Sequence, residues 1–274
     1  NMDELKKKVG AMLTHLKEEK PLVHCISNYV TINDCANILL AIGAKPIMAD
    51  AIDEVGEIEC QCSSLVINIG MISYEKIESI IEAGKIANKV GIPIILDPVG
   101  INVSRFRKNA AIKMLKKLNI TAIRGNASEI RCLCGLKTQS KGVDSFETMS
   151  EDESKEIIIT VSKKYKCIVA MTGMVDYITD GKRIVRISNG NKMMSYVSGT
   201  GCMTSALIGG FLGACDDYFL SVVAGIMIMG IIGEKALDML KENEGSGTYK
   251  VKIIDAAFNL KAFEIMERGQ VYEE

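Results

Sequence analysis

Two glycines one residue apart, Gly199 and Gly201, stand directly before Cys202 at the start of a long apolar run. This pattern predicts a tight turn that opens into a buried helix, whose first backbone N–H groups lack partners within the helix. Such N–H groups and the partial positive charge of the helix end attract anions, and glycines let an anion approach the backbone closely. A phosphate in this turn would lie beside the Cys202 thiol. In the alternative interpretation, Ser198 or Thr200 caps the helix and the turn binds no ligand.

Two carboxylates that follow predicted strands are candidate ligands for a magnesium ion. Asp97 ends the apolar segment at residues 93–97, and Glu129 lies three residues after Asn126 at the start of a predicted helix. Mg²⁺ prefers hard oxygen ligands and often keeps its own water molecules between itself and the protein. Glu129 has a second interpretation, because Asn followed three residues later by Glu is the pattern of a capping box.

Two more polar residues end predicted strands. The guanidinium of Arg124 could bind a phosphate, or it could pair with one of the two carboxylates. Thr172 offers a hydroxyl donor, although a threonine at a strand end is also a common turn residue. The sequence contains no G-x-x-x-x-G-K-[ST] segment and no G-x-G-x-x-G segment after a strand. The glycine turn at residues 199–202 is therefore the candidate phosphate loop.

The elements that must position these residues alternate along the chain. Short segments rich in branched apolar residues predict strands, and apolar residues at three- and four-residue spacing predict the helices between them. The predicted strands are residues 22–30, 45–49, 65–70, 93–97, 121–124 and 167–173. Strands joined through helices form a mostly parallel sheet with helices on both faces, so the predicted fold class is α/β.

Ligands of such sheets bind at the carboxyl ends of the strands. The residues predicted there are Asn28, Met48, Asn68, Gly70, Asp97, Arg124, Asn126 and Thr172. We therefore expect these side chains to gather at one edge of the sheet, together with the glycine turn.

The remaining segments give further expectations. Asp180-Gly181 predicts a hairpin with a two-residue turn. The second apolar helix after Cys202 meets charges at Glu234-Lys235 before it reaches the roughly 18 residues of a membrane span, so both apolar helices are predicted to lie in the core. A flexible link at residues 245–250 and a closing helix at residues 253–268 are expected, with an exposed loop at residues 144–152.

Composition excludes several classes of partner. The formal net charge is -1, the basic residues are scattered, and aromatic residues make up 5% without any Trp, so we expect no nucleic-acid partner. The charged N-terminal segment lacks the pattern of a signal peptide, which predicts a cytoplasmic protein that contacts no membrane.

The nine cysteines, an odd number mostly in apolar surroundings, predict buried reduced thiols. Two C-x-C pairs, Cys60 with Cys62 and Cys132 with Cys134, have no His nearby. A thiol-rich metal or redox protein built on these pairs is the non-enzymatic alternative.

Together, these segments resemble the hydroxyethylthiazole kinase family of the ribokinase-like superfamily. The resemblance runs from about Val23 to Leu240 and is carried by Asn28, residues 44–48, 97–100 and 124–130, Thr172-Gly173 with Asp176, and residues 199–202. It implies one ribokinase-like kinase domain over residues 1–274. It also implies ATP-dependent phosphorylation of the primary alcohol of 4-methyl-5-(2-hydroxyethyl)thiazole for thiamine diphosphate salvage, by a homotrimer with active sites between neighbouring subunits.

The resemblance also implies a role for each matching residue. The thiazole pocket falls on Asn28, Met48, Gly70 and Gly199, the ATP contacts on Arg124, Asn126 and Thr172, and Mg²⁺ on Asp97 and Glu129. Gly199, Thr200 and Gly201 become the anion hole for the transferring phosphoryl group, and Cys202 faces the substrate hydroxyl. The wider superfamily commonly has Asp at this last position, as the base.

Two other enzymes of the same fold remain as alternatives. One is a kinase of the hydroxymethylpyrimidine or pyridoxal type, and the other is an ATP- or ADP-dependent dehydratase of hydrated NAD(P)H. Both are expected to carry Asp in the glycine turn, and the dehydratase also needs room for a dinucleotide. The cysteine at position 202 favours the thiazole kinase over both.

Overall fold

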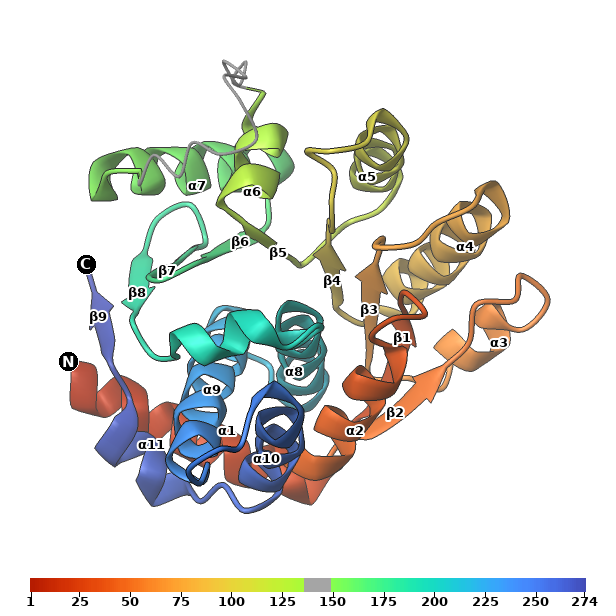
Figure 1. The fold of residues 1–274 in the computed structure, drawn as a ribbon. Helices are drawn as coiled ribbons and strands as arrows, with labels where there is room; N and C mark the ends of the chain where they lie inside the picture. The colour runs from red at the N-terminus through yellow and green to blue at the C-terminus, as the bar shows by residue number, and fades with distance from the viewer. Residues whose placement is uncertain (136–148) are drawn as a thin grey trace.

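One mixed sheet runs through the part of the chain that the computed structural model describes, residues 1–135 and 149–274 (Figure 1). Its strand order is β2-β1-β3-β4-β5-β6-β7-β8-β9. The parallel strands are β1 (Leu22–Ile26), β2 (Lys45–Met48), β3 (Ser64–Asn68), β4 (Ile94–Asp97), β5 (Ala122–Asn126) and β6 (Ile168–Thr172). The antiparallel strands are β7 (Asp176–Thr179), β8 (Ile184–Ile187) and β9 (Val271–Glu273). The predicted α/β class and the parallel centre are confirmed.

Helices cover both faces of the sheet, and each face has its own apolar core (Figure 1). One face carries α1 (Met2–Glu19), α2 (Ile32–Ile42), α8 (Thr200–Ala214), α9 (Tyr218–Asp238), α10 (Ser246–Phe258) and α11 (Ala262–Arg268). The opposite face carries α3 (Val55–Glu59), α4 (Tyr74–Val90), α5 (Arg105–Lys117), α6 (Ala127–Cys134) and α7 (Glu151–Tyr165).

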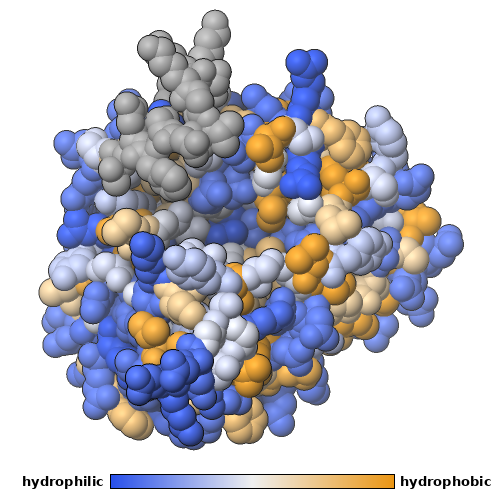
Figure 2. Space-filling view, in the orientation of Figure 1, coloured by the Kyte–Doolittle hydropathy of each residue, from blue (hydrophilic) through white to orange (hydrophobic). Residues whose placement is uncertain are grey.

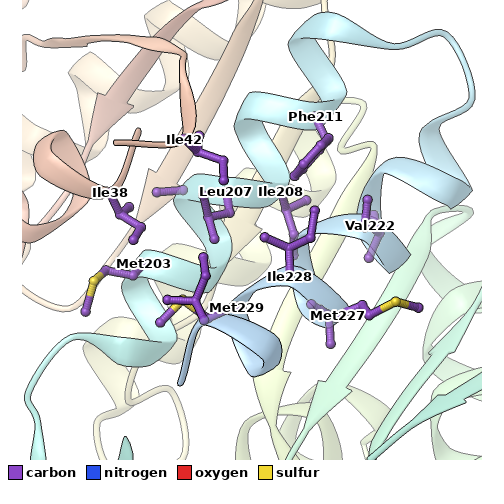
Figure 3. Close-up of a cluster of buried hydrophobic side chains, with 14 of the residues drawn as sticks. Ile38, Ile42, Met203, Leu207, Ile208, Phe211, Val222, Met227, Ile228 and Met229 are labelled. Carbon is purple, nitrogen blue, oxygen red and sulfur yellow. The ribbon is translucent and has the colours of Figure 1, made fainter. Parts of the chain in front are cut away.

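The helix that follows the glycine turn, α8, is enclosed by its neighbours. Residues 202–212 are all buried, and the apolar side chains of α8 pack against those of α2 and α9 (Figure 3). Each buried Leu, Ile or Phe side chain contributes about 1.5–3 kcal/mol through its burial. The cluster around Leu207 and Phe211 therefore fixes the start of α8 relative to the sheet.

The neighbouring helix α9 corrects one prediction. It does not end at Glu234 and Lys235, as expected, but continues through them and runs for 21 residues. By length and composition it could therefore cross a membrane. However, 78% of its most apolar 18-residue window is buried inside the protein. The predicted place of this helix in the core is thus confirmed, although the argument from its length was wrong.

Three connections differ from the sequence-based expectations. The β7–β8 hairpin turns through residues 180–183 instead of two residues, because the Asp180 carboxylate accepts hydrogen bonds from the backbone of Lys182 and Arg183. The expected link at residues 245–250 is the first turn and a half of α10, and the expected closing helix is two helices followed by the short strand β9. Of the loop expected at residues 144–152, residues 144–148 lie outside the described part, and residues 151–152 begin α7.

Candidate active site

The carboxyl ends of the parallel strands bring the predicted residues to one edge of the sheet. Asn68 pairs with Asp97 across β3 and β4, and Asn126 pairs with Thr172 across β5 and β6. Asn28 follows β1 and Met48 ends β2, which lies beside β1. On the face that Figure 2 shows, the molecule is hollowed near its centre.

The start of α8 lacks a side-chain cap. Gly199 is the N-cap residue, its φ is 96°, and a Cβ atom there would lie 2.9 Å from Cγ2 of Thr31. The Thr200 hydroxyl donates to the backbone oxygen of Met194 and so does not cap the helix. The first intrahelical bond runs from the Met203 N–H to the Gly199 oxygen at 2.8 Å. The alternative in which Ser198 or Thr200 caps this helix is therefore wrong.

Gly201 brings this helix start against a cation. A Cβ atom on Gly201 would lie 3.1 Å from Nη2 and 3.3 Å from Nη1 of Arg124. The guanidinium thus packs directly on the glycine turn, which a larger side chain would prevent. The positive charge of Arg124 adds to that of the helix end, and both favour an anion at this position.

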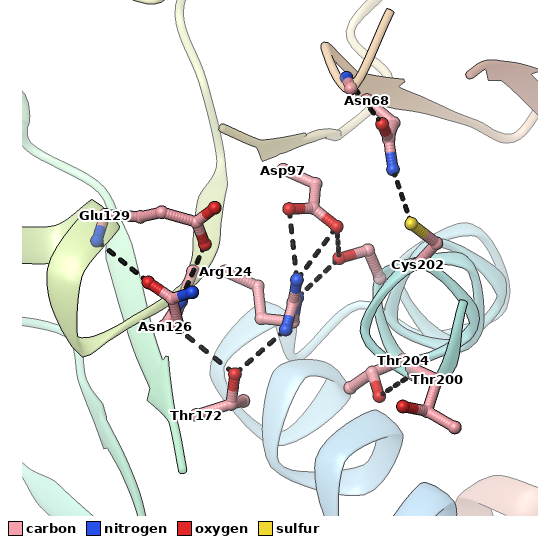
Figure 4. A network of polar contacts seen from close by, with 12 residues as sticks. Asn68, Asp97, Arg124, Asn126, Glu129, Thr172, Thr200, Cys202 and Thr204 are labelled. Atoms are coloured by element: carbon pink, nitrogen blue, oxygen red, sulfur yellow. Dashed lines mark hydrogen bonds and ion pairs between the residues drawn. The ribbon is translucent and has the colours of Figure 1, made fainter. Parts of the chain in front are cut away.

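Arg124 is held by three side chains that come from different elements (Figure 4). Nη2 donates to both oxygens of Asp97 at 3.0 Å, Nη1 donates to the Thr172 hydroxyl at 2.8 Å, and Nε donates to Ser205 at 2.7 Å. Of the two interpretations of Arg124, pairing with a carboxylate is the one observed. A guanidinium has five N–H donors, so it retains donor capacity for a phosphate oxygen.

Ser205 is a site residue that the sequence-based interpretation missed. It lies one turn after Cys202 on α8, it is fully buried, and its hydroxyl donates to Oδ2 of Asp97 at 2.8 Å. Three-residue spacing from Cys202 places it on the same side of the helix, which is the signal that could have found it.

Glu129 forms the capping box that the alternative interpretation predicted. Its Oε1 accepts the Asn126 N–H at 2.9 Å, and the Asn126 side chain accepts the Glu129 N–H at 2.9 Å. Its Oε2 accepts the Gly100 N–H at 2.8 Å. Asn126 was predicted to contact ATP, but its side-chain oxygen is occupied by the capping bond. Through the Gly100 contact, Glu129 also links α6 to the loop after β4.

The two carboxylates fit a magnesium ion that is held through water. Burial raises the pKa of Asp97, the Arg124 guanidinium opposes that rise, and the charge of Glu129 adds to it. Two carboxyl groups thus lie near one guanidinium, and a bound cation would favour the charged form of Asp97. Within residues 1–135 and 149–274, no group of three or more His, Cys, Asp or Glu side chains could hold a metal. Water would therefore have to complete the coordination shell.

Cys202 lies in the first turn of α8 and its sulfur faces the Asn68 amide (Figure 4). Its Sγ lies 3.0 Å from Nδ2 of Asn68 and 3.7 Å from Nδ2 of Asn28. Burial raises the pKa of the Cys202 thiol, and the negative charge of Asp97 raises it further, whereas the Thr31 hydroxyl, the Asn68 amide and the charge of Arg124 lower it. The sulfur is thus a thiol in the resting site, placed among donors that favour its negative form.

A cavity of about 630 Å³ is lined by segments that follow Asn28, Met48 and Gly70 in the sequence. Its lining includes Tyr29, Asp50, Ile52, Met71, Ile72 and Lys76. These residues follow β1, β2 and β3, so the cavity continues the edge of the sheet where Asn28, Met48 and Gly70 lie. The lining itself includes neither Cys202 nor the predicted pocket residues Asn28, Met48, Gly70 and Gly199.

The comparison with protein families decides which group of enzymes has this site. The sequence model described as the Hydroxyethylthiazole kinase family matches residues 13–262. The chain belongs to the hydroxyethylthiazole kinase family. A protein named hydroxyethylthiazole kinase from Clostridium beijerinckii is 48% identical over 274 residues, which cover 99% of each chain. One of the same name from Alkaliphilus oremlandii is 47% identical over 270 residues, which cover 98% of this chain and 99% of the relative.

Solved structures agree with this family assignment. The structure of the hydroxyethylthiazole kinase protein from Pyrococcus horikoshii OT3 has a TM-score of 0.89 and 33% identity, and the match covers 98% of this chain and 99% of that one. The pyridoxal kinase of Staphylococcus aureus in complex with AMP-PCP has a TM-score of 0.66 at 14% identity, over 93% of this chain and 99% of that one. This second likeness shows the ribokinase-like fold alone. The family assignment supports the thiazole kinase over the pyridoxal-type kinase and the dehydratase.

Proposed function

We propose that this chain transfers the γ-phosphoryl group of ATP to the primary alcohol of 4-methyl-5-(2-hydroxyethyl)thiazole, a salvage reaction for thiamine diphosphate. The observation that carries the proposal is the uncapped start of α8, which lies against the Arg124 guanidinium with Cys202 in its first turn. The names of the relatives support the thiazole alcohol as substrate. Because ATP is a cytoplasmic metabolite, we place the reaction in the cytoplasm.

The phosphoryl group passes from ATP to the alcohol through a loose transition state, so the protein contributes mainly position and charge. The N–H groups of Thr200, Gly201 and Cys202 and the guanidinium of Arg124 stabilise the phosphoryl oxygens. Cys202 orients the alcohol and accepts its proton late in the transfer. Asp97 and Glu129 are the residues that would hold Mg²⁺, which would supply neutralisation of negative charge on the phosphates.

The substrates occupy opposite sides of α8. Arg124 and Thr172 bind the phosphates of ATP at the ends of β5 and β6, and Asn126 contributes its remaining polar atoms at the same place. The thiazole ring lies among Asn28, Met48, Gly70 and Gly199, at the ends of β1, β2 and β3. In this arrangement, the alcohol reaches the phosphorus at the mouth of the glycine turn.

We further propose a homotrimer in which each active site lies between neighbouring subunits. Four apolar side chains beside the thiazole pocket are exposed: Tyr29 at 67%, Val30 at 66%, Ile52 at 50% and Met71 at 41%. Exposed apolar side chains that cluster beside a binding site mark a contact surface. A second copy of the chain would cover them and close the pocket.

The test is the release of ADP with three alcohols compared side by side, hydroxyethylthiazole, hydroxymethylpyrimidine and pyridoxal, with and without Mg²⁺. We expect rapid release with hydroxyethylthiazole and Mg²⁺, slow release with the other two alcohols, and loss of release when Mg²⁺ is removed. Equal or faster release with pyridoxal would reject the proposed substrate. Release that is unchanged without Mg²⁺ would reject the metal site.

A further inference from the structure

Asn68 places a buried amide between the thiazole pocket and Cys202. It ends β3 and is 1% exposed. Its Nδ2 donates to Sγ of Cys202 at 3.0 Å, and its Oδ1 accepts the Gly70 N–H at 2.9 Å and Nδ2 of Asn28 at 3.0 Å. Every polar atom of this side chain therefore has a partner in the site.

The orientation of the amide follows from its partners. A backbone N–H can only donate, so the Asn68 atom that faces Gly70 has to be the oxygen, and the NH₂ group then faces the sulfur. A Cβ atom on Gly70 would lie 2.9 Å from Nδ2 of Asn28 and 3.1 Å from Oδ1 of Asn68. The glycine thus lets both amides approach, and the network fixes a donor toward Cys202.

A donor at this position opposes the effects of burial and of Asp97 on the sulfur. Burial and the charge of Asp97 favour the neutral thiol, whereas the Thr31 hydroxyl, the Asn68 amide and the charge of Arg124 favour the thiolate. Hydrogen bonds to a charged partner are stronger than those between neutral groups. The Asn68 N–H therefore stabilises Cys202 most when the sulfur carries negative charge.

We propose that Asn68 is a positioning residue that acts through Cys202, by holding the sulfur in the place and charge state in which it serves the substrate alcohol. The inference rests on the proposed function. The step starts from the small fraction of molecules in which the Cys202 thiol has released its proton to solvent. As the alcohol oxygen bonds to phosphorus and the bond between phosphorus and the departing ADP oxygen breaks, the alcohol proton passes to this Cys202 thiolate and restores the thiol. Asn68 itself exchanges no proton.

The sharpest variant is Asn68→Asp, because it has the same shape and keeps an oxygen for Gly70 and Asn28. The substitution exchanges only the NH₂ group that donates to the sulfur for a negatively charged oxygen that cannot donate. The matched control is Asn37→Asp, which makes the same exchange on the exposed surface of α2, where the Asn37 amide bonds only to Asn33. We expect Asn68→Asp to lower kcat by about ten- to a hundredfold, with KM for both substrates within about threefold, whereas Asn37→Asp matches the parent.

A double-mutant cycle separates this role from a structural one. In the Cys202→Ala background the sulfur is absent, so adding Asn68→Asp is expected to change the residual kcat by less than about threefold. The inference is overturned if Asn68→Asp lowers kcat by the same factor with and without the sulfur, because the amide would then act on the fold of the site and not on Cys202.

A second readout needs no substrate. Alkylation of Cys202 by iodoacetamide, followed by mass spectrometry of its peptide, is expected to slow by about tenfold or more in Asn68→Asp and to stay unchanged in Asn37→Asp. Alkylation that is as fast as in the parent overturns the inference. A parent that releases no ADP with hydroxyethylthiazole rejects the proposed function instead, and the alkylation comparison still decides the amide–sulfur contact. If Asn68→Asp does not fold, Gly70→Ala displaces the same amide and is expected to slow alkylation in the same sense.

Discussion

Cys202 occupies the place where the wider superfamily commonly has an aspartate. Because burial and Asp97 raise the pKa of the Cys202 thiol, only a small fraction of it is present at neutral pH as the thiolate that can accept a proton. A loose phosphoryl transfer tolerates this, because the proton leaves the alcohol late. The NH₂ groups of Asn68 and Asn28 could donate to a carboxylate at this position as well as to a sulfur.

Replacement of Cys202 by aspartate therefore tests the role of the sulfur. We expect Cys202→Asp to keep kcat at or above that of the parent, because a carboxylate is ionised at neutral pH and receives the same donors. Cys202→Ala, the control without an acceptor, is expected to lose about a hundredfold in kcat. Steady-state ADP release measures both. An alanine variant as fast as the parent would contradict any proton-accepting role of Cys202.

The contact between Gly201 and Arg124 predicts a loss of turnover that grows with the size of the side chain at position 201. In Gly201→Val the Cβ atom alone would lie 3.1 Å from Nη2 of Arg124, and the two further methyl groups are expected to nearly abolish turnover. Gly201→Ala requires Arg124 to shift by a few tenths of an ångström and is expected to retain partial activity. Thermal melting provides the control for folding. Normal turnover by a folded Gly201→Val protein would show that the anion does not bind at this turn.

At the scale of elements, the parallel strands and the helices between them were predictable, whereas the contacts between side chains were not. The apolar runs at β3, β4 and β6 and the glycine turn before α8 follow from local pattern. The spacing of Ser205 from Cys202 places both on one side of α8, but their partners Asp97 and Asn68 depend on how α8 lies across β3 and β4, which local spacing does not encode. Strand β9 was missed because three residues at the end of a chain carry no periodicity.

The capping box at α6 allows the metal role of Glu129 to be separated from its structural role. Glu129→Gln keeps an oxygen that can accept the Asn126 N–H, but its NH₂ group then faces the Gly100 N–H and that bond is lost, so we expect a loss of stability of about 1–3 kcal/mol. The lost charge is expected to raise the Mg²⁺ concentration needed for half-maximal activity several-fold. Calorimetric titration with Mg²⁺ and ATP checks this without turnover. Unchanged Mg²⁺ dependence would remove Glu129 from the metal site.

The turn between β6 and β7 predicts a pH dependence of stability. Burial raises the pKa of Asp176 to about 7 from its ordinary 3.8, although its Oδ1 accepts the Gly173 N–H. Between these two values the folded chain holds a proton that the unfolded chain has lost, so this group's contribution to stability falls as the pH rises from 3.8 to about 7. The loss is at most about 1.4 kcal/mol for each unit of difference in pKa.

Asp176→Asn removes this titration and keeps an oxygen for Gly173. We expect the variant to melt at a higher temperature than the parent at pH 8, and the gap to shrink as the pH falls toward 5. Thermal melts at several pH values measure this. A gap that stays constant across the range would place the cause outside the ionisation of Asp176.

At the scale of the whole molecule, the sheet edge that holds the site also carries exposed apolar side chains. Tyr29, Val30, Ile52 and Met71 lie within one to four residues of the thiazole-pocket residues Asn28, Met48 and Gly70. Assembly would bury these side chains and complete the pocket, so we expect oligomeric state and thiazole binding to depend on each other.

Val30→Glu tests this link between assembly and binding. Light scattering of the parent is expected to give a mass near three chains of 29.9 kDa, and the variant is expected to give a smaller mass and a KM for the thiazole raised about tenfold. Val251→Glu, at a 60% exposed position on α10, is the control and is expected to match the parent. A parent of single-chain mass would contradict the trimer.

The central claim is that the uncapped start of α8 receives the phosphoryl group as it moves from ATP to the alcohol. A crystal structure with ADP, Mg²⁺, hydroxyethylthiazole and aluminium fluoride tests it directly, since the fluoride complex imitates the transferring group. We predict fluorine atoms at about hydrogen-bond distance from the backbone nitrogens of Thr200, Gly201 and Cys202 and from the Arg124 guanidinium, with the alcohol oxygen beside the Cys202 sulfur. A fluoride complex bound elsewhere along the strand ends, with the start of α8 empty, would contradict the account.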